Sequence, residues 1–423
     1  MLPIHLFRQN KDLVLEGLKK KNFKELDLVD RIISIDERRR LLQVENDNLS
    51  AFVNSASKNV GQMMAKGDKD GAEQLKNEVA TNKEKARIVA QSLSELETEL
   101  YDALVRLPNL PHGSVPVGKT PEENEVVRSG GEMPDLSAQK VPHWDLMTKY
   151  ELMDLELGTK ITGSGFPVFM GQGAKLQRSL IQYFLNYNID AGYKEYCPPF
   201  MVNEASAYGT GQLPDKEGQM YYASADGFYL IPTAEVPVTN IYRDTILQEN
   251  ELPVKMTAYS PCFRREAGSY GKDVRGLNRV HQFDKVEVVQ ITNPATSYET
   301  LDGMVTHVEK LLQTLELPYR ILRLCGGDMS FSSALTYDFE VYSAAQERWL
   351  EVSSVSNFET FQSNRMKIRY KDGSGKTQLV HTLNGSSLAL PRIMACLLEN
   401  NQVPGGIKIP AALQPYFGKE MIN

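Results

Sequence analysis

Hydrophobic positions recur every seven residues through the first quarter of the chain, from Asp27 to Leu107, where helix-breaking residues are almost absent. The repeat stops once, at the polar segment "KGDKDGA" (66–72), and then resumes. Its members are Ile35, Leu42, Leu49, Ala56 and Met63 before the break, and Val79, Ala86, Leu93 and Leu100 after it, with Val89, Leu96 and Ala103 as a second series. This pattern predicts two long helices packed antiparallel as a coiled-coil arm. Each helix would have about 35 residues and extend about 50 Å, so we expect the arm to project from the rest of the protein.

The predicted arm (27–107) has two interpretations: a rod for packing or dimerisation, or a lever that contacts a large partner. Residues 1–110 contain equal numbers of basic and acidic side chains, so the net charge of −7 arises in the rest of the chain. A nucleic acid would therefore contact local basic clusters such as residues 19–21 and 38–40. Taken alone, each cluster is more simply interpreted as solvated helix surface.

A different pattern follows the arm. The segment "LPNLPHGSVPVG" (107–118) is rich in proline and glycine and ends the helical repeat. We predict a helical domain at 1–110, a linker at 111–134 and a second domain at 135–423, in which helices are interspersed with strand-like runs. These runs are "YKEYCPPFMV", "FYLIPTAEVPVT", "VKMTAYSPCFRRE", "RVHQFDKVEVVQI", "TYDFEVYSA", "RWLEVSSVS" and "QLVHTLNGS". Many follow one another without an intervening helix, which predicts an α+β fold with a mainly antiparallel sheet flanked by helices.

Composition narrows the class of protein. With 423 residues, 24% of them charged, and a mean hydropathy of −0.36, the chain is typical of a soluble globular protein. It has no apolar run of roughly 18 residues that could span a membrane, and its N-terminus does not resemble a secretory signal, so we expect a cytoplasmic location. The four cysteines, Cys197, Cys262, Cys325 and Cys396, are too widely spaced for a metal knuckle, and we predict that they are reduced and buried.

The most charge-rich stretch, residues 262–290, consists of two strand-like runs joined by a long loop, 267–279. Strand alternation places Cys262, Arg264 and Glu266 on one face of the first run. In the second run, His281, Phe283, Lys285 and Glu287 share a face. Together these faces offer a guanidinium for phosphate or carboxylate, an aromatic plate for a base, and carboxylates for an amine, which suits a nucleotide beside an amino compound. An exposed charged hairpin is the alternative.

Three segments carry a resemblance to class II aminoacyl-tRNA synthetases. "CFRREAGSYGKDVRGLNRVHQFDKVE" (262–287) resembles the second signature motif of that class, "GYKEYCPPFMVN" (192–203) the first, and "TLNGSSLALPRIMACLLENN" (382–401) the third. "IPTAEVPVTN", "GTGQLP", "GDMSFSSALTYDFEV" and "LEVSSVSNF" resemble segments particular to seryl-tRNA synthetases, as does the N-terminal coiled-coil arm. The match spans essentially the whole chain in order, so the chain is identified as a member of the seryl-tRNA synthetases of bacterial type.

The resemblance implies roles for individual residues. The implied catalytic residues are Arg264, Glu287 and Arg392. The implied serine-binding residues are Thr233, Ala234, Glu235, Glu287, Asn384 and Ser386. The implied ATP-binding residues are Arg264, Arg265, Glu266, Arg279, Val280, Phe283, Glu351, Val352, Ser353, Ser354 and Arg392. Glu351 and Ser354 match the positions that hold Mg²⁺, the implied metal cofactor.

Within this set, the resemblance places Arg264 on the α-phosphate and the serine carboxylate, and Glu266 on the adenine amino group. Phe283 would stack on one face of adenine, and Arg392 would cover the other side or meet the γ-phosphate. The loop 267–279, with Lys272, Arg275 and Arg279, would lie on the path of the tRNA acceptor end.

Several of these residues also have simpler interpretations. Thr233 and Glu235, two apart on a predicted strand, could face solvent, and Glu287 could pair with Lys285 on the surface. Ser386 could cap the following helix, and Arg392 could face solvent. The chain also departs from the family pattern at four positions, which are Gly165, Leu335, Ser387 and Pro391.

The implied activity is ATP-dependent attachment of serine to tRNA(Ser) through a seryl-adenylate, with tRNA(Sec) as a further candidate substrate. The implied assembly is a homodimer through the first motif, with tRNA bound across the subunits. A non-catalytic RNA-binding relative of the same fold is the alternative. A threonine-specific relative is a third hypothesis, but the chain lacks the zinc-ligand set expected for it.

Overall fold

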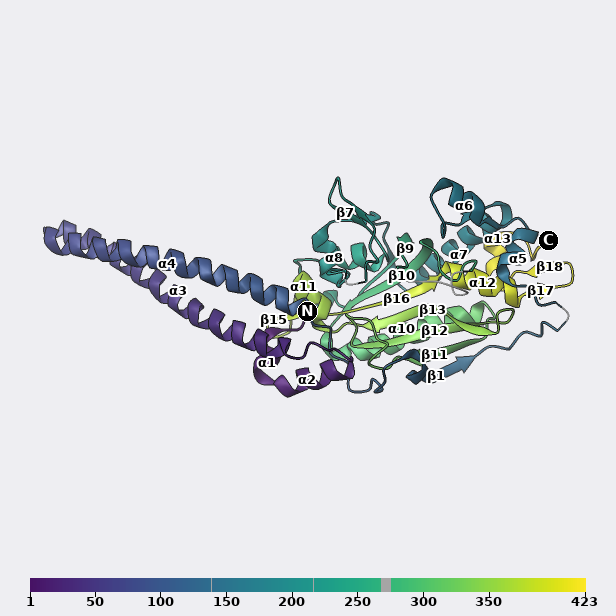
Figure 1. The fold of residues 1–423 in the computed structure, drawn as a ribbon, viewed down its shortest axis with the longest axis horizontal. Helices are drawn as coiled ribbons and strands as arrows, with labels where there is room; N and C mark the ends of the chain where they lie inside the picture. The colour runs from purple at the N-terminus through teal and green to yellow at the C-terminus, as the bar shows by residue number, and fades with distance from the viewer. Residues whose placement is uncertain (138, 216, 268–274) are drawn as a thin grey trace. The chain divides into compact units, whose positions relative to one another are not determined.

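The computed structural model describes residues 1–423 except 138, 216 and 268–274, and its chain divides into two compact units (Figure 1). One unit comprises residues 2–19 and 23–108. The other comprises Met1, residues 20–22 and residues 109–423. None of the helices in the described part of the chain is long and apolar enough to cross a membrane.

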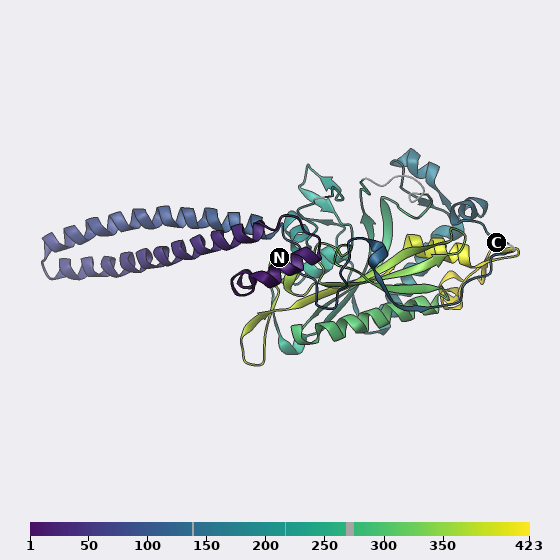
Figure 2. The same ribbon diagram turned by 60° about the horizontal axis from the view of Figure 1, so that its bottom comes forward.

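The first unit is helical, with α1 (Ile4–Gln9) and α2 (Lys11–Lys20) followed by α3 (Leu28–Ala65) and α4 (Lys69–Leu104). The prediction of two long, paired helices is confirmed, and α3 and α4 run side by side in Figures 1 and 2. All the heptad positions named above are buried or half-buried, which is the reason these two polar helices pair. Asp68 caps α4, since its side chain accepts a hydrogen bond from the Gly71 backbone N–H at 3.0 Å.

A buried carboxylate joins α1 to α3. The Asp36 side chain is 2% exposed and accepts hydrogen bonds from Arg8 Nε at 2.6 Å, Arg8 Nη2 at 2.8 Å and Arg39 Nη2 at 3.1 Å. Although burial opposes it, these hydrogen bonds lower the pKa of Asp36 below its usual value. The start of the long helix is therefore fixed by a bidentate ion pair.

The second unit is built on an eight-stranded sheet with the order β1-β11-β12-β13-β16-β10-β9-β4. In that order the strands are β1 (Glu125–Gly130), β11 (Tyr319–Arg323), β12 (Leu335–Ser343), β13 (Arg348–Asn357), β16 (His381–Ala389), β10 (Gln282–Thr292), β9 (Val254–Phe263) and β4 (Lys194–Glu195). Every neighbouring pair is antiparallel except β4 and β9, so the predicted α+β class is confirmed.

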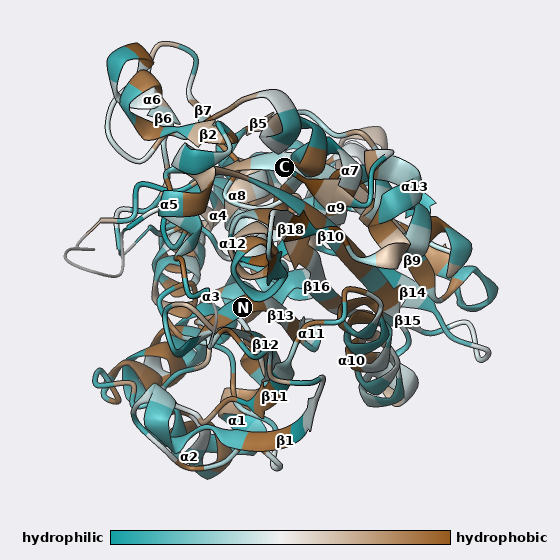
Figure 3. Cartoon of the chain, turned by 90° about the vertical axis from the view of Figure 1, so that its right-hand side faces the viewer, coloured by the Kyte–Doolittle hydropathy of each residue, from teal (hydrophilic) through white to brown (hydrophobic). Residues whose placement is uncertain are grey.

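One face of this sheet packs against helices. The main core joins the sheet to α5 (His143–Lys149), α7 (Gly171–Asp190), α10 (Ser297–Thr314), α12 (Leu390–Asn400) and α13 (Gln414–Phe417). Brown and teal segments both occur along α10 in Figure 3, as expected of a helix that covers a sheet. On β10, Val286 and Val288 belong to this core, whereas Lys285 and Glu287 line a cavity. Because successive side chains of a strand point to opposite faces, one face of β10 packs in the core and the other lines the cavity.

Shorter elements complete the second unit. The remaining strands are β2 (Met153–Asp154), β3 (Val168–Phe169), β5 (Met201–Val202), β6 (Tyr222–Ala223), β7 (Phe228–Leu230), β8 (Ile246–Gln248), β14 (Arg369–Lys371), β15 (Thr377–Leu379), β17 (Gln402–Val403), β18 (Gly406–Lys408) and β19 (Met421–Ile422). The remaining α-helices are α6 (Leu155–Ile161), α8 (Glu204–Thr210), α9 (Glu235–Asn240) and α11 (Thr360–Met366). Among the residues that the structure describes, the 3₁₀ turns include η1 (Pro121–Glu123), η2 (Glu249–Glu251), η4 (Pro294–Thr296) and η5 (Ala411–Leu413).

Several predictions from the sequence are wrong. The run "YKEYCPPFMV" is not one strand, because it contains only the short strands β4 and β5. Arg264 and Glu266 lie beyond the end of β9 at Phe263, and His281 precedes β10, so these three residues are not on the strands that the alternation predicted.

The run "FYLIPTAEVPVT" is not one strand, because β7 ends at Leu230 and helix α9 begins at Glu235. Pro232 and Pro237 lack the N–H that a strand ladder requires, whereas a helix tolerates proline in its first turn. The four cysteines are free, but Cys197 is exposed rather than buried.

Candidate active site

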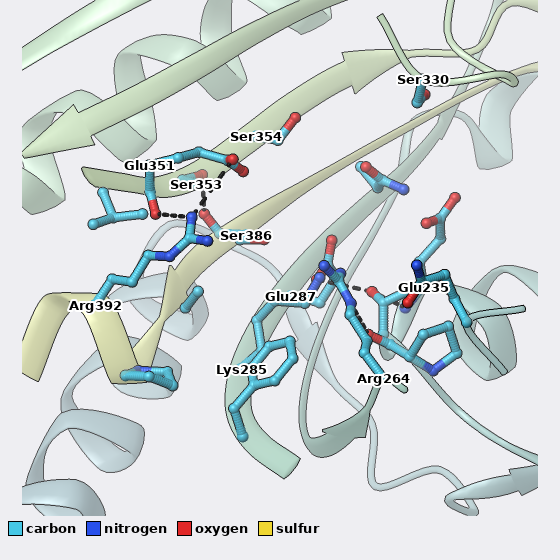
Figure 4. Close-up of a pocket in the computed structure, with 18 of the residues that line it drawn as sticks. Glu235, Arg264, Lys285, Glu287, Ser330, Glu351, Ser353, Ser354, Ser386 and Arg392 are labelled. Atoms are coloured by element: carbon cyan, nitrogen blue, oxygen red, sulfur yellow. Dashed lines mark hydrogen bonds and ion pairs between the residues drawn. The ribbon is translucent and has the colours of Figure 1, made fainter. Parts of the chain in front are cut away.

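A cavity of about 530 Å³ is lined by β10, β13, β16, the start of α12 and the segment that follows β9 (Figure 4). Nearly all of the residues predicted for serine and ATP line it. These are Thr233, Glu235, Arg264, Glu266, Arg279, Val280, Phe283, Glu287, Glu351, Val352, Ser353, Ser354, Asn384, Ser386 and Arg392. Ala234 is instead packed in a hydrophobic cluster, and Arg265 is exposed away from the cavity lining.

One end of the cavity is lined by a buried cluster around Glu287. Lys285 Nζ lies 2.5 Å from Glu287 Oε2, and the two side chains are only 7% and 3% exposed. Thr233 Oγ1 donates to the same carboxylate oxygen at 3.2 Å and accepts from the Glu235 N–H at 3.2 Å. Glu287 therefore does pair with Lys285, but inside the cavity rather than on the surface. Opposite it in register lies Ser386, within β16 and four residues before α12 begins, so Ser386 does not cap that helix.

Glu235 is the second buried carboxylate of this cluster. Its Oε1 accepts a hydrogen bond from Gln362 Nε2 at 2.5 Å. Burial, and then the negative charge of Glu287, raise the pKa of Glu235 to about 7, against the opposing effects of Gln362, Lys285 and Asn384. Two carboxylates close to one lysine leave a net negative, water-poor pocket, which favours a small ligand that carries an ammonium group.

The cavity also contains an arginine from the segment that follows β9 and an aromatic ring from β10. The Arg264 guanidinium lies 5.2 Å from the centroid of the Phe283 ring, and its Nε donates to the Pro232 carbonyl at 3.4 Å. Glu266 Oε2 lies 3.2 Å from Arg279 Nη1. This group can contact a phosphate or carboxylate through the guanidinium and a nucleobase through the ring.

At the other end, α12 directs Arg392 into the cavity beside β13, as Figure 4 shows. Arg392 Nη1 donates to the Glu351 carbonyl at 2.8 Å and lies 3.6 Å from Glu351 Oε2, and Arg392 Nε donates to the Asn278 carbonyl at 3.1 Å. Ser353 Oγ donates to the Ser386 carbonyl at 2.6 Å, which ties β13 to β16. Arg392 is therefore a cavity residue held by backbone carbonyls, not simply an exposed helix side chain.

Oxygen donors for a magnesium ion lie beside Arg392. Glu351 and Ser354 both line the cavity, and Asp338 faces Ser354 across β12 and β13. Burial, and then the charge of Glu351, raise the pKa of Asp338 well above its usual value, and its buried Oδ1 has no hydrogen-bond partner in the described chain. A cation beside Glu351 would relieve this repulsion. Glu351 and Ser354 offer oxygen atoms, the kind of ligand that Mg²⁺ prefers in proteins.

The structure adds polar residues that the sequence interpretation did not assign to the site. These are Gln212, Glu217, Gln219, Asn278, Lys285, Ser330, Ser332 and Ser356. Lys285 had a local signal, because it shares a strand face with Glu287. Gln362 bonds Glu235 from α11, and the two lie far apart in the sequence, so no local pattern could have indicated it.

The long loop of the second motif is described only in part. Lys272 lies outside the described residues, whereas the Arg275 guanidinium lies 4.5 Å from the centroid of the Trp144 ring. The departures from the family pattern have local explanations at two positions. Ser387 Oγ donates to the buried Asn188 Oδ1 at 2.9 Å, and Pro391 lies in the first turn of α12, where its missing N–H has no helical partner.

The other two departures are also accommodated. At Gly165, φ is +82°, and an added Cβ would come within 2.4 Å of the His281 ring, so glycine suits this position. Leu335 is 3% exposed and packs in the main core.

Comparisons with known proteins agree with this geometry. The chain matches the family described as the seryl-tRNA synthetase N-terminal domain over residues 1–111, and that described as the tRNA synthetase class II core domain (G, H, P, S and T) over residues 221–401. A serine–tRNA ligase of Salinibacter ruber is 50% identical over 420 residues, covering 99% of this chain and 98% of that protein. One of Methylacidiphilum infernorum is 46% identical over 424 residues, covering 100% of both.

Solved structures give the same answer. The seryl-tRNA synthetase of Pyrococcus horikoshii, complexed with ATP, has a TM-score of 0.92 at 32% identity and covers 100% of this chain and 99% of that one. The cytoplasmic serine–tRNA ligase of Naegleria fowleri, in complex with AMP, has a TM-score of 0.87 at 28% identity, with 100% and 99% coverage. The family predicted from the motifs is confirmed. The chain belongs to the seryl-tRNA synthetase family, the class II enzymes that use ATP to ligate serine to tRNA.

Proposed function

We propose that this chain attaches L-serine to tRNA(Ser) in two steps within the cavity described above. The observation that carries the proposal is that one cavity joins an anionic pocket at Glu235 and Glu287 to the phosphate- and base-binding groups Arg264, Phe283 and Arg392. The pocket suits the ammonium and hydroxyl groups of serine, and the remaining groups suit ATP. A non-catalytic relative would have no need for this set of charged side chains.

In the first step, a serine carboxylate oxygen attacks the α-phosphorus of ATP, the bond from that phosphorus to the bridging oxygen breaks, and pyrophosphate leaves. No protein nucleophile takes part, so positioning and charge neutralisation must supply the rate. We assign Arg264 to the α-phosphate and the serine carboxylate, and Phe283 to adenine stacking. Arg392 would meet the γ-phosphate or the second face of the base.

Adenine recognition and serine selection complete the assignment. Glu266 would accept a hydrogen bond from the adenine amino group, with Arg279 beside it, and Thr233 with Glu235 and Glu287 would bind serine. A pocket with buried polar groups rejects alanine because those groups would be left unpaired. Glu351 and Ser354 would hold Mg²⁺, which when bound would neutralise phosphate charge.

In the second step, the ribose hydroxyl of the terminal tRNA adenosine attacks the seryl carbonyl and AMP leaves. We propose tRNA(Ser) as the principal RNA and tRNA(Sec) as a second candidate. The resemblance of residues 192–203 to the first class II motif supports a homodimer with tRNA bound across its subunits, and we propose the cytoplasm as the site of this reaction. The coiled-coil helices suit recognition of RNA shape through phosphate and 2′-OH contacts.

Serine-dependent exchange between ATP and labelled pyrophosphate tests the first step. The expected result is exchange with serine, strong discrimination against alanine and threonine, and loss of exchange when Mg²⁺ is chelated. Charging of tRNA(Ser) transcript then tests the second step. Absence of exchange with serine at saturating ATP and Mg²⁺ would refute the enzyme, and exchange with another amino acid would reassign its specificity.

A further inference from the structure

A buried histidine and glutamate lie next to the active site but do not line it. His143 begins α5, Glu399 lies in α12, and both side chains are 0% exposed. His143 Nδ1 is 2.6 Å from Glu399 Oε1, and the His143 backbone N–H donates to the same oxygen at 3.0 Å. Ser343 Oγ donates to Glu399 Oε2, and Gln346 Nε2 donates to Oε1 at 3.0 Å. Nothing in the adenylation chemistry requires this cluster.

The second nitrogen of the histidine holds the main chain of the ATP-binding loop. His143 Nε2 accepts a hydrogen bond from the Leu277 backbone N–H at 2.9 Å. A backbone N–H can only donate, so Nε2 must be unprotonated and the ring proton must be on Nδ1, where it is donated to Glu399. The carboxylate therefore fixes the tautomer that the loop requires.

Residues of this loop end contact the cavity directly. Leu277, Asn278, Arg279 and Val280 all line it, and the Asn278 carbonyl accepts the hydrogen bond from Arg392 Nε. The Asn278 side chain is also held, since its Nδ2 donates to Gln346 Oε1 at 2.9 Å. Gln346 thus contacts both Glu399 and the loop.

Helix α12 provides both Arg392 and Glu399, the two residues that connect it to the loop. Arg392 and Glu399 are seven residues apart on α12, which is close to two turns, so they lie on the same side of the helix. Arg392 binds the loop at Asn278, and Glu399 binds it at Leu277 through His143. Close packing adds a steric limit, because a Cβ at Gly276, where φ is +63°, would come within 2.2 Å of His143 Nε2.

We propose that His143 and Glu399 are positioning residues for ATP: they hold the 276–280 segment and, through it, the orientation of Arg392 and Arg279. The assignment rests on the proposed adenylation activity, but the hydrogen bond that carries it can be tested separately. Although burial opposes it, hydrogen bonds from His143 and Ser343 lower the pKa of Glu399, so the carboxylate is ionised and a strong acceptor.

Two variants of His143 distinguish the roles of its two ring nitrogens. His143→Asn places an amide near the Nδ1 position and leaves the Leu277 N–H without its acceptor, whereas His143→Gln places an amide oxygen near Nε2 and can restore that acceptor. We expect His143→Asn to raise the KM for ATP about tenfold in pyrophosphate exchange, as for loss of one buried hydrogen bond. The KM for serine should stay within about twofold, and His143→Gln should keep the KM for ATP within about threefold.

A control variant tests whether a general loss of stability could change the KM for ATP. His381→Gln removes another mostly buried imidazole, which bonds Ser297 at 2.8 Å and does not contact the loop. It should lower the melting temperature without changing the KM for ATP. If His143→Asn does not fold, Gly276→Ala perturbs the same contact from the loop side and should also raise the KM for ATP.

Amide hydrogen exchange provides a readout that does not depend on activity. In the ATP-free protein, the Leu277 amide should exchange at least about tenfold faster in His143→Asn than in the parent, and remain protected in His143→Gln and His381→Gln. Equal effects of the Asn and Gln variants, or parallel changes in the KM values for ATP and serine, would overturn the proposal. If the parent shows no serine-dependent exchange activity, the proposed function fails, while Leu277 protection still tests the contact.

Discussion

Glu235 is a carboxylate of the cavity whose pKa is raised to about 7 by burial and then by the charge of Glu287. A glutamate between two prolines on a predicted strand could have faced solvent, but here it begins a helix, lines the cavity and is 8% exposed. Gln362 bonds it, and Glu287 repels it, with Lys285 as the nearby cation. Under the proposed assignment of Glu235 to serine, its ionisation near pH 7 would make serine binding depend on pH.

The pH dependence of serine use tests this environment. With a pKa of about 7, Glu235 is neutral below that pH and cannot pair with the serine ammonium. We therefore expect kcat/KM for serine in pyrophosphate exchange to fall about tenfold per pH unit below pH 7 and to level off above it. The profile should be measured between about pH 5.5 and 8.

Glu235→Gln is the matched variant for this prediction. It should lower kcat/KM for serine about 100-fold at pH 8, because a charge-assisted hydrogen bond is lost, and its profile should be flat across the same range. A parental profile without a bend, or a variant that keeps the bend, would show that another group titrates.

Among the elements, β10 shows how one strand serves two purposes. Its even-numbered residues 286 and 288 pack against helices, and its odd-numbered residues 283, 285 and 287 line the cavity. Alternation in the sequence predicted which side chains share a face. It could not predict that the Lys285–Glu287 face would be covered, since that depends on residues 231–240, which the sequence pattern assigned to a strand.

The base of α3 offers a test of an element held by a buried charge. Asp36→Asn removes the ionised partner of Arg8 and Arg39, and we expect it to destabilise local structure at the start of α3 by about 1–3 kcal/mol. This expected destabilisation is at the lower end of the range for a buried ion pair because the Arg8 side chain is 36% exposed. Hydrogen-exchange free energies across residues 28–40 measure it, and serine-dependent exchange activity should be unchanged.

The exposed pair Glu84 and Arg87 on α4 is the control for Asp36. Glu84→Gln should leave protection across both helices unchanged, because solvent screens an exposed pair. Since the folded-state pKa of Asp36 is lowered, its stabilising effect is present above the unfolded pKa and is lost as pH falls through the folded value. Similar effects of both variants would mean that burial is not what makes the Asp36 pair important.

At the scale of the whole molecule, shortening the arm should affect tRNA(Ser) charging but not serine-dependent pyrophosphate exchange. All residues that line the cavity fall between 212 and 392, so none comes from α3 or α4. To shorten the arm, we would remove residues 42–62 from α3 and 73–93 from α4, which is three heptads from each helix. Whole heptads preserve the register of the hydrophobic positions. The deletion also keeps the turn, where Met63 lies next to Gly71. We expect serine-dependent exchange within about twofold of the parent and a loss of about 100-fold or more in tRNA(Ser) charging.

The outcome decides between the two interpretations of the arm. Loss of charging alone would support a lever that contacts RNA. Loss of both activities would mean that the long helices are needed for folding, and unchanged charging would mean that RNA is recognised elsewhere. The predicted domain boundaries at 110 and 135 remain a prediction, and this shortening does not depend on them.

Sequence by itself determined the features that repeat locally or occur as contiguous motifs. The paired helices α3 and α4 followed from a seven-residue hydrophobic period, and the shared face of Phe283, Lys285 and Glu287 on β10 from a period of two. The site residues came from motif segments, each only 9 to 26 residues long, that resemble one family. Arg264 and Arg392 lie far apart in the sequence, but both could be assigned to the site because each belongs to its own motif.

Only the tertiary structure decided how those segments meet. Gln362 reaches Glu235 from α11, and His143 joins Glu399 to Leu277 across segments more than 100 residues apart. Burial then changes the chemistry of these groups, raising the pKa of Glu235 and pairing Lys285 with Glu287 away from water. Such contacts depend on which surfaces pack together and exclude solvent, and no pattern within a short stretch of sequence specifies that.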